Sequence, residues 1–171
     1  GGTNARLLVH DAGHGLEMIS LAARFGRGLP CNVSPLEVDA LSGFGHAEML
    51  AALACGFEHV DVLMSPKTER DVIEGQAELA CSMAGSQAVR LLHPADPDAL
   101  CGVLYQDVEN AVSCTPILPM GSRRQVARLA AKTLQPDADV IELSSNAPYG
   151  AIVVDTDACT LCLSCVSLCP S

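Results

Sequence analysis

The stretch "HVDVLMSPKTERDVIEGQAELACSMAGSQAVRLLH", His59 to His93, decides the fold. It begins with a β-rich run at 59–64 and ends with a second apolar run at 88–93, and both runs predict strands. Residues 65–85 between them place apolar side chains on one helical face, which predicts one long helix. These side chains are Val72, Ile73, Ala77, Leu79, Ala80 and Met83. A strand, a helix and a strand in this order are typical of a parallel βαβ unit.

The same alternation extends over most of the chain. Strands are expected at 5–10, 31–38 and 138–143, helices at 15–28, 46–57, 96–106 and 122–135, and a loop with two prolines at 107–121. Asp96 is a candidate N-cap with Pro97 in the first turn, and Ser122 is a candidate cap of the last helix. The pattern predicts an α/β domain over residues 3–145. We expect an open, mostly parallel sheet with helices on both faces, a three-layer arrangement of the flavodoxin or Rossmann kind.

The composition narrows the possible functions. The 171 residues are 49% hydrophobic but only 3% aromatic, and 10 basic against 20 acidic residues give a formal charge of −10. An acidic chain argues against nucleic acid, whose phosphates a binding protein must neutralise. No apolar run reaches the length of a membrane span, and the first residues do not resemble a signal peptide. Nine cysteines, an odd number, in a chain of this size favour a reducing cytoplasm over a disulfide framework.

Four of the cysteines form a motif: Cys159, Cys162, Cys165 and Cys169 follow C-x2-C-x2-C-x3-C, and Pro170 comes next. A short strand at 151–155 is expected to lead into them. This spacing is typical of a bacterial [4Fe–4S] site. The alternatives are four unrelated thiols or a zinc site, but zinc sites usually pair two C-x2-C arms across a longer gap. The motif therefore predicts an iron–sulfur cluster with all four cysteines as ligands.

The other cysteines are scattered through the α/β segment: Cys31, Cys55, Cys81, Cys101 and Cys114. Each is expected to be a small buried hydrophobic residue, with Cys114 the one most exposed. In two-cluster ferredoxins the fourth cysteine of the motif ligates the other cluster. The first cluster would then need a ligand from a later motif, and none follows Cys169 in this sequence. Either Cys169 turns back onto the first cluster, or the chain is a fragment of a longer protein, and we expect the fragment. The isolated chain is then expected to hold little intact cluster.

Residues 147–170, "APYGAIVVDTDACTLCLSCVSLCP", resemble the start of a bacterial 2[4Fe–4S] ferredoxin domain, as found in polyferredoxin-like proteins. The resemblance implies that residues 146–171 begin a ferredoxin domain, truncated here. It also implies two [4Fe–4S] clusters in a full-length protein and redox partners such as an oxidoreductase or a dehydrogenase.

A second stretch, "LEVDALSGFGHAEMLAALACGFEHVDVLM" at 36–64, is similar to the hydrogenase iron–sulfur subunit family, the delta subunit of methyl-viologen-reducing hydrogenase. That family implies an α/β domain that passes electrons between partners. Its cysteine-containing loop for a [2Fe–2S] cluster corresponds to Met64–Glu69 here, which has no cysteine. Cys31 is near the position of the upstream cysteine ligand in that family, but the cysteines that would share a cluster with it are missing here. The resemblance therefore carries the fold to this chain, but not the cluster.

Two glycine- and histidine-containing stretches follow predicted strands, "DAGHGLE" at 11–17 and "SGFGHAE" at 42–48. A flavin or a nucleotide phosphate at such helix starts is an alternative, although neither stretch matches a dinucleotide-binding or P-loop motif. "SRRQVAR" at 122–128 is the main basic concentration, either a solvated helix face or a docking patch. The leading expectation is an iron–sulfur electron-transfer protein whose α/β domain docks redox partners. A flavin- or nucleotide-binding oxidoreductase subunit and a non-redox assembly scaffold remain alternatives.

Overall fold

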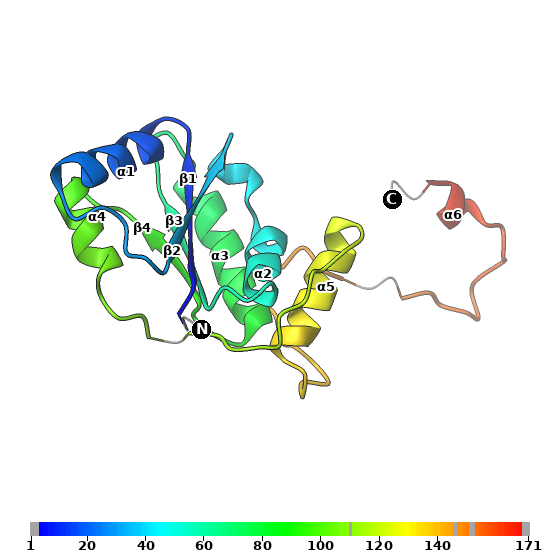
Figure 1. Cartoon of the computed structure of the whole chain (residues 1–171). Helices are drawn as coiled ribbons and strands as arrows, with labels where there is room; N and C mark the ends of the chain where they lie inside the picture. Colours follow the sequence, from blue (N-terminus) through cyan, green and yellow to red (C-terminus); the bar gives the residue numbers. More distant parts are fainter. Residues whose placement is uncertain (1–3, 110, 146, 151–152, 169–171) are drawn as a thin grey trace.

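The computed structural model describes residues 4–109, 111–145, 147–150 and 153–168. Most of these residues form one α/β unit, from which the chain continues through an extended segment to a short last helix (Figure 1). The predicted α/β fold is thus confirmed.

In the described part of the chain, four parallel strands form the sheet, in the order β2-β1-β3-β4. The strands are β1 (Arg6–Asp11), β2 (Val33–Val38), β3 (His59–Leu63) and β4 (Val89–Leu92). The helices are α1 (His14–Phe25), α2 (His46–Ala54), α3 (Arg70–Ala84), α4 (Pro97–Leu104), α5 (Arg123–Leu134) and α6 (Ser164–Leu168), with a 3-10 turn, η1, at Leu41–Gly43. Pro35 lies in β2, an edge strand, where a missing backbone donor is tolerated.

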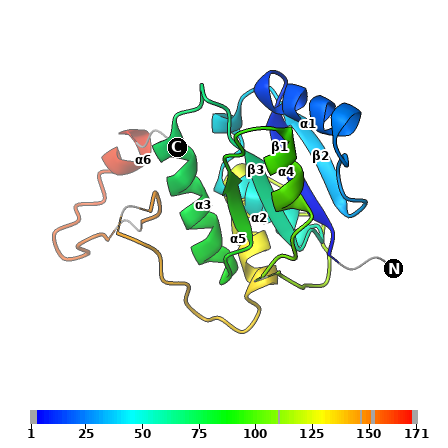
Figure 2. The ribbon, with the colours of Figure 1, turned by 90° about the vertical axis from the view of Figure 1, so that its left-hand side faces the viewer.

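Helices cover both faces of the sheet (Figure 2). One face packs with α1 and α4 around Leu8, Leu63 and Leu100. The other face packs with α2 and α3, and α5 lies mainly against α2. Because the buried side chains of α5 are the small residues Ala127, Ala130 and Ala131, this helix can approach α2 closely.

Both predicted helix caps are confirmed. The carboxylate of Asp96 accepts a hydrogen bond from the backbone N–H of Ala99 at 2.7 Å, and Pro97 opens α4. Ser122 and Gln125 form a reciprocal capping box at the start of α5. Such caps satisfy backbone donors that have no partner inside the helix.

The strand predicted at 138–143 is wrong, because these residues have no regular secondary structure. Ile141 and Leu143 instead pack, half-buried, against the core on the α2 side. They supply apolar contacts there without backbone pairing, so their alternating pattern resembled a strand. For the strand predicted at 151–155, residues 151–152 lie outside the described residues and 153–155 form no strand. The helix expected at 65–85 begins only at Arg70, because Ser65–Glu69 form the loop after β3.

Asp61, in the middle of β3, is a fully buried charge. Its carboxylate contacts Arg6 at 2.6 Å and Arg90 at 2.8 Å, while Nε2 of His59 lies 3.5 Å away. Burial alone would raise the pKa of Asp61, but the interactions with His59, Arg90 and Arg6 outweigh it and lower the pKa from 3.8 to about 2. Arg6 also donates to the carbonyl of Leu104 at the end of α4. The cluster therefore ties three strands to a helix C-terminus.

Candidate functional site

The predicted cysteine ligands lie in the segment that follows the α/β unit. Cys159, Cys162 and Cys165 are all exposed free thiols, and Cys165 belongs to α6. Cys169, the fourth predicted ligand, lies outside the described residues. The carboxylate of Asp155 accepts hydrogen bonds from the backbone N–H groups of Asp157 and Ala158, which holds the turn before the first cysteine.

The backbone bends sharply on both sides of Cys162. Leu161 and Leu163 have φ angles of 56° and 60°, a left-handed conformation that is uncommon for residues other than glycine. Residues in such conformations recur where backbone N–H groups gather around a negatively charged group. The local chain geometry is therefore compatible with a loop that wraps an anionic cluster.

The thiol of Cys162 has a lowered pKa. Its Sγ atom lies 3.4 Å from the hydroxyl oxygen of Ser164. Hydrogen bonds from Ser164 and Thr160 lower the pKa of Cys162 from 9.0 to about 7. Because iron binds thiolates rather than thiols, this side chain has the chemistry of a ligand.

In the described residues, the structure does not gather three or more histidine, cysteine or acidic side chains into a metal-binding group. The three thiols are neighbours along the chain without converging on one point. What fits a [4Fe–4S] cluster is the donor set itself: three accessible sulfurs within seven residues, one of them close to ionisation at neutral pH.

The cysteines of the α/β unit differ from the prediction in part. Cys81 and Cys101 are buried, as expected, but Cys31 and Cys55 are exposed and Cys114 is half-buried. Cys31 stands in the turn before the edge strand β2, and Cys55 follows the last residue of α2, so neither faces the core. The thiol of Cys114 instead points at the carbonyls of Leu53 and Ala54, and burial raises its pKa. The expectation that Cys31 and Cys55 are buried and that Cys114 is the most exposed was wrong.

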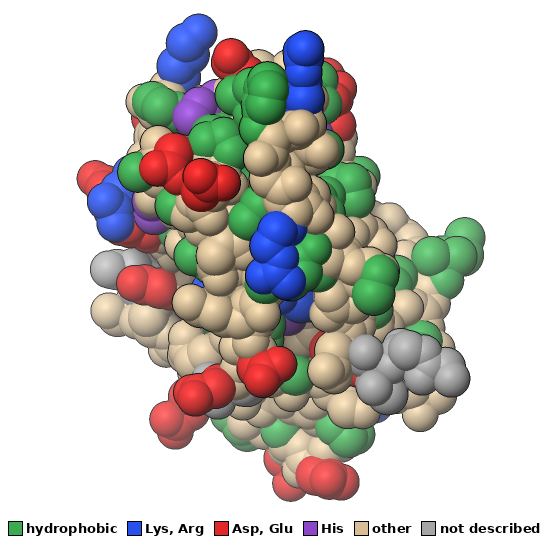
Figure 3. All heavy atoms as spheres, turned by 60° about the vertical axis from the view of Figure 1, so that its left-hand side comes forward, with side chains coloured by type: hydrophobic (Ala, Val, Ile, Leu, Met, Phe, Trp, Pro, Cys, Tyr) green, Lys and Arg blue, Asp and Glu red, His purple; other side chains and the backbone are tan. Residues whose placement is uncertain are grey.

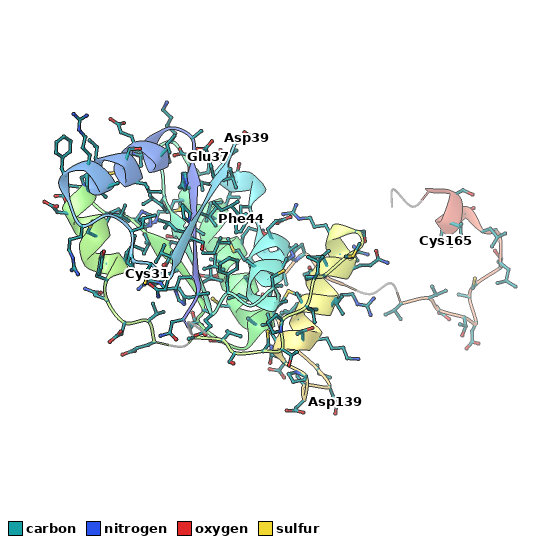
Figure 4. All side chains as sticks on the ribbon, viewed as in Figure 1. Cys31, Glu37, Asp39, Phe44, Asp139 and Cys165 are labelled. Atoms are coloured by element: carbon teal, nitrogen blue, oxygen red, sulfur yellow. The ribbon has the colours of Figure 1, made fainter. Side chains whose placement is uncertain are left out.

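None of these cysteines joins the predicted ligands. Figure 4 shows Cys31 on the α/β unit and Cys165 on the far side of the extended segment. The described cysteines of the α/β unit therefore add no ligand to the cysteine segment in this arrangement.

The carboxyl ends of the strands form a crevice of about 430 Å³. It lies where parallel α/β sheets commonly bind ligands. Asp11, Asp39 and Glu69 line it together with a single cation, Lys67, and Glu37 and Asp39 can be seen at this end of β2 in Figure 4. Three carboxylates against one ammonium repel a phosphate group, which disfavours the nucleotide alternative at this place.

In both glycine- and histidine-containing stretches, a carboxylate of this chain already accepts a hydrogen bond from a backbone N–H group at the helix start. At α1, the carboxylate of Asp11 accepts the N–H of Gly15 at 2.6 Å. At α2, the carboxylate of Glu48 accepts the N–H of Gly45 at 3.0 Å. Because these carboxylates occupy the positions that an anion would take, the glycines serve turns here rather than a phosphate.

A contact that the sequence did not predict joins the cysteine segment to the α/β unit. His46 begins α2, and its Nε2 atom lies 2.7 Å from the hydroxyl of Tyr149. Its backbone N–H and its Nδ1 atom both contact the side-chain oxygen of Gln76 in α3. Residues 103 positions apart meet here, so no local sequence pattern could have revealed the pair.

None of the helices in the described part of the chain has the length and apolar character that crossing a lipid bilayer requires. Comparisons of the chain with curated proteins and with solved structures found no match. Residues 148–171, which begin next to the His46–Tyr149 contact and contain all four predicted ligands, match the family model of the 4Fe-4S binding domain, and this match supports an iron–sulfur electron-transfer role.

Proposed function

We propose that the chain is an iron–sulfur electron-transfer protein in which Cys159, Cys162 and Cys165 bind one [4Fe–4S] cluster. The observation that carries the proposal is the set of three exposed cysteines at ferredoxin spacing within the matched segment. A [4Fe–4S] cluster, when bound, accepts and releases single electrons. The residues of the chain supply the thiolates, and Ser164 and Thr160 favour the thiolate at Cys162.

Cys169 is proposed as a ligand of a second cluster, as the spacing of two-cluster ferredoxins implies. The alternative is that Cys169 completes the first cluster. The two assignments differ in a measurable quantity, the iron bound by this chain alone. Four irons per chain, with full brown absorbance after anaerobic reconstitution, would place Cys169 on the first cluster.

The α/β domain, residues 3–145, is proposed to dock redox partners such as an oxidoreductase or a dehydrogenase, with the ferredoxin segment beginning at 146. The resemblance to the hydrogenase iron–sulfur subunit family supports this division of labour. Met64 to Glu69, where that family has a cysteine loop, offers no thiolate. We therefore propose that the α/β domain carries no cluster of its own.

Anaerobic reconstitution with iron and sulfide tests the proposal. Because Cys169 is assigned to a second cluster, the chain alone is expected to bind iron and acid-labile sulfide well below the four irons of a complete cluster, and Cys162→Ala is expected to reduce both. Cys31→Ala is the matched control, because it removes an exposed thiol outside the matched segment. Equal iron in the two variants would contradict the proposed ligands. Bound flavin released on denaturation would favour the oxidoreductase alternative instead.

A further inference from the structure

Helix α5 concentrates positive charge in an acidic protein. It carries four of the ten basic residues of the chain, Arg123, Arg124, Arg128 and Lys132. No acidic residue occurs in the sequence between Glu109 and Asp137. Acidic side chains are spread over other parts of the surface, including the face shown in Figure 3. The helix is therefore an exception to the charge of the whole molecule.

Three of these basic side chains share one face of α5. Arg124, Arg128 and Lys132 are spaced four residues apart, so each is turned about 40° from the one before it. All three are exposed, and the strip they form runs beside the buried alanines of α5, because Ala131 is seven residues from Arg124 and so only about 20° away around the helix. Arg123 is different, because it pairs with Glu48 at 2.7 Å. Among the described residues, the other three have no ion-pair partner within 4.0 Å.

This arrangement does not stabilise the helix. Like charges four residues apart repel each other by about 0.2–0.5 kcal/mol per pair. A single acidic residue on this face would have relieved the repulsion, and the capping box and buried alanines already account for the stability of α5. These basic side chains are therefore better suited to binding negative charge on another molecule than to stabilising α5.

The basic face of α5 begins beside the first residues of the cysteine segment. Arg124 lines a crevice of about 340 Å³ together with His46, Pro148 and Tyr149. Pro148 and Tyr149 are the first residues of the matched 4Fe-4S binding segment. In Figure 1, α5 is the helix of the α/β unit nearest to the chain that leads to α6. A protein held on α5 would therefore lie next to Pro148 and Tyr149, the residues that lead into the predicted ligands.

Apolar side chains adjoin the charges. Leu129 lies on the same side of α5 and is 44% exposed, and Leu118 and Met120, in the loop just before the helix, are 76% and 74% exposed. Interfaces between proteins combine such apolar contacts with a charged rim. The α5 face, defined as Arg124, Gln125, Arg128, Leu129 and Lys132, has both components.

We propose that the α5 face docks an acidic electron-transfer protein, which deepens and rests on the proposed iron–sulfur function. Charge complementarity accelerates encounter and fixes orientation. Because the rest of the molecule is acidic, it repels an acidic partner at other places and directs it to α5.

Binding of a flavodoxin, a small acidic electron-transfer protein, by the full chain tests the proposal. The affinity is measured by thermophoresis at low and at physiological salt, with iron loading measured in the same samples. The charge reversal Arg124→Glu, Arg128→Glu, Lys132→Glu is expected to weaken binding at least about ten-fold. The matched control reverses three exposed basic residues elsewhere, Arg24→Glu, Arg27→Glu, Arg70→Glu, and is expected to stay within about two-fold of the unchanged chain. Far-UV circular dichroism checks that the variants fold, and the milder Gln substitutions at the three α5 positions are expected to weaken binding in the same direction.

Equal losses in the two reversed variants, or no flavodoxin binding at low salt, would overturn the proposal. A single-stranded DNA oligonucleotide that binds the α5 face more tightly than flavodoxin would also overturn it, because the face would then serve nucleic acid. Binding does not require a loaded cluster. Unchanged flavodoxin binding in a chain that loads no iron would therefore refute the proposed function and leave the α5 face standing.

Discussion

The Nε2 atom of His46 and the hydroxyl of Tyr149 lie 2.7 Å apart and connect the first turn of α2 to the chain just before the cysteines. The side-chain oxygen of Gln76 accepts a hydrogen bond from the backbone N–H of His46. Because an amide oxygen has no hydrogen to donate, it is also the acceptor in its contact with Nδ1 of His46, and Nδ1 is the donor. Nε2 is then the acceptor of the neutral ring, and Tyr149 donates to it. This chain of hydrogen bonds fixes where the cysteine segment leaves the α/β unit.

Removing the hydroxyl should loosen this junction. We expect Tyr149→Phe to cost about 1 kcal/mol of stability, because His46 loses its donor in a half-buried place. Amide hydrogen exchange of Ala147, whose N–H donates to the carbonyl of Ser144, should become faster, while β1 and β3 stay protected. Tyr105→Phe is the control, since its hydroxyl donates at 3.2 Å to the exposed carbonyl of Arg27 and touches neither element of the junction. Unchanged exchange at Ala147 in Tyr149→Phe would mean that the His46–Tyr149 hydrogen bond does not hold the segment.

The α/β part of the fold followed from local patterns in the sequence. The β3–α3–β4 stretch has its apolar residues at strand and helix spacings. Asp96 and Ser122 could be predicted as caps because aspartate and serine are residue types that commonly cap helices. The strand predicted at 138–143 was wrong because Ile141 and Leu143 are half-buried against the core without pairing with a neighbouring strand.

Long-range contacts escaped prediction. Asp61 stands inside an apolar strand, and only the assembled sheet reveals the two arginines that neutralise it. The predicted ligands were found by spacing alone, because four cysteines within eleven residues need no tertiary structure to be recognised. The His46–Tyr149 contact joins distant residues and had no such signal.

Asp61 is expected to be essential for stability. Asp61→Asn leaves the buried guanidinium of Arg6 and the half-buried one of Arg90 without a counter-charge, which should cost about 3–5 kcal/mol. Urea denaturation measures the loss. Glu74→Gln breaks the exposed ion pair with Arg70 and should cost no more than about 0.5 kcal/mol. Similar values for the two variants would show that the buried cluster contributes no more than a surface pair.

The same carboxylate should make the fold sensitive to acid. Its pKa is lowered on folding from 3.8 to about 2, so the folded chain binds the proton less readily than the unfolded chain. The stabilisation of about 2 kcal/mol is therefore complete above pH 4 and is lost as the pH falls toward 2. Denaturant midpoints measured across this range should drop more for the unchanged chain than for Asp61→Asn. Parallel curves for the two proteins would exclude Asp61 as the source.

Gly15 is required by close packing at the start of α1. A Cβ atom there would lie 2.6 Å from Cβ of His10 and 3.1 Å from the Asp11 oxygen that accepts the Gly15 N–H. His10 is buried in β1 and cannot move aside, so Gly15→Ala should destabilise the fold by about 1–3 kcal/mol. Gly75→Ala in α3 is the matched control. A Cβ there meets no atom within 4 Å, and the better helix propensity of alanine should stabilise the fold by up to about 1 kcal/mol. Thermal denaturation should therefore shift in opposite directions for the two variants, and a shift in the same direction would contradict the packing of α1 against the end of β1.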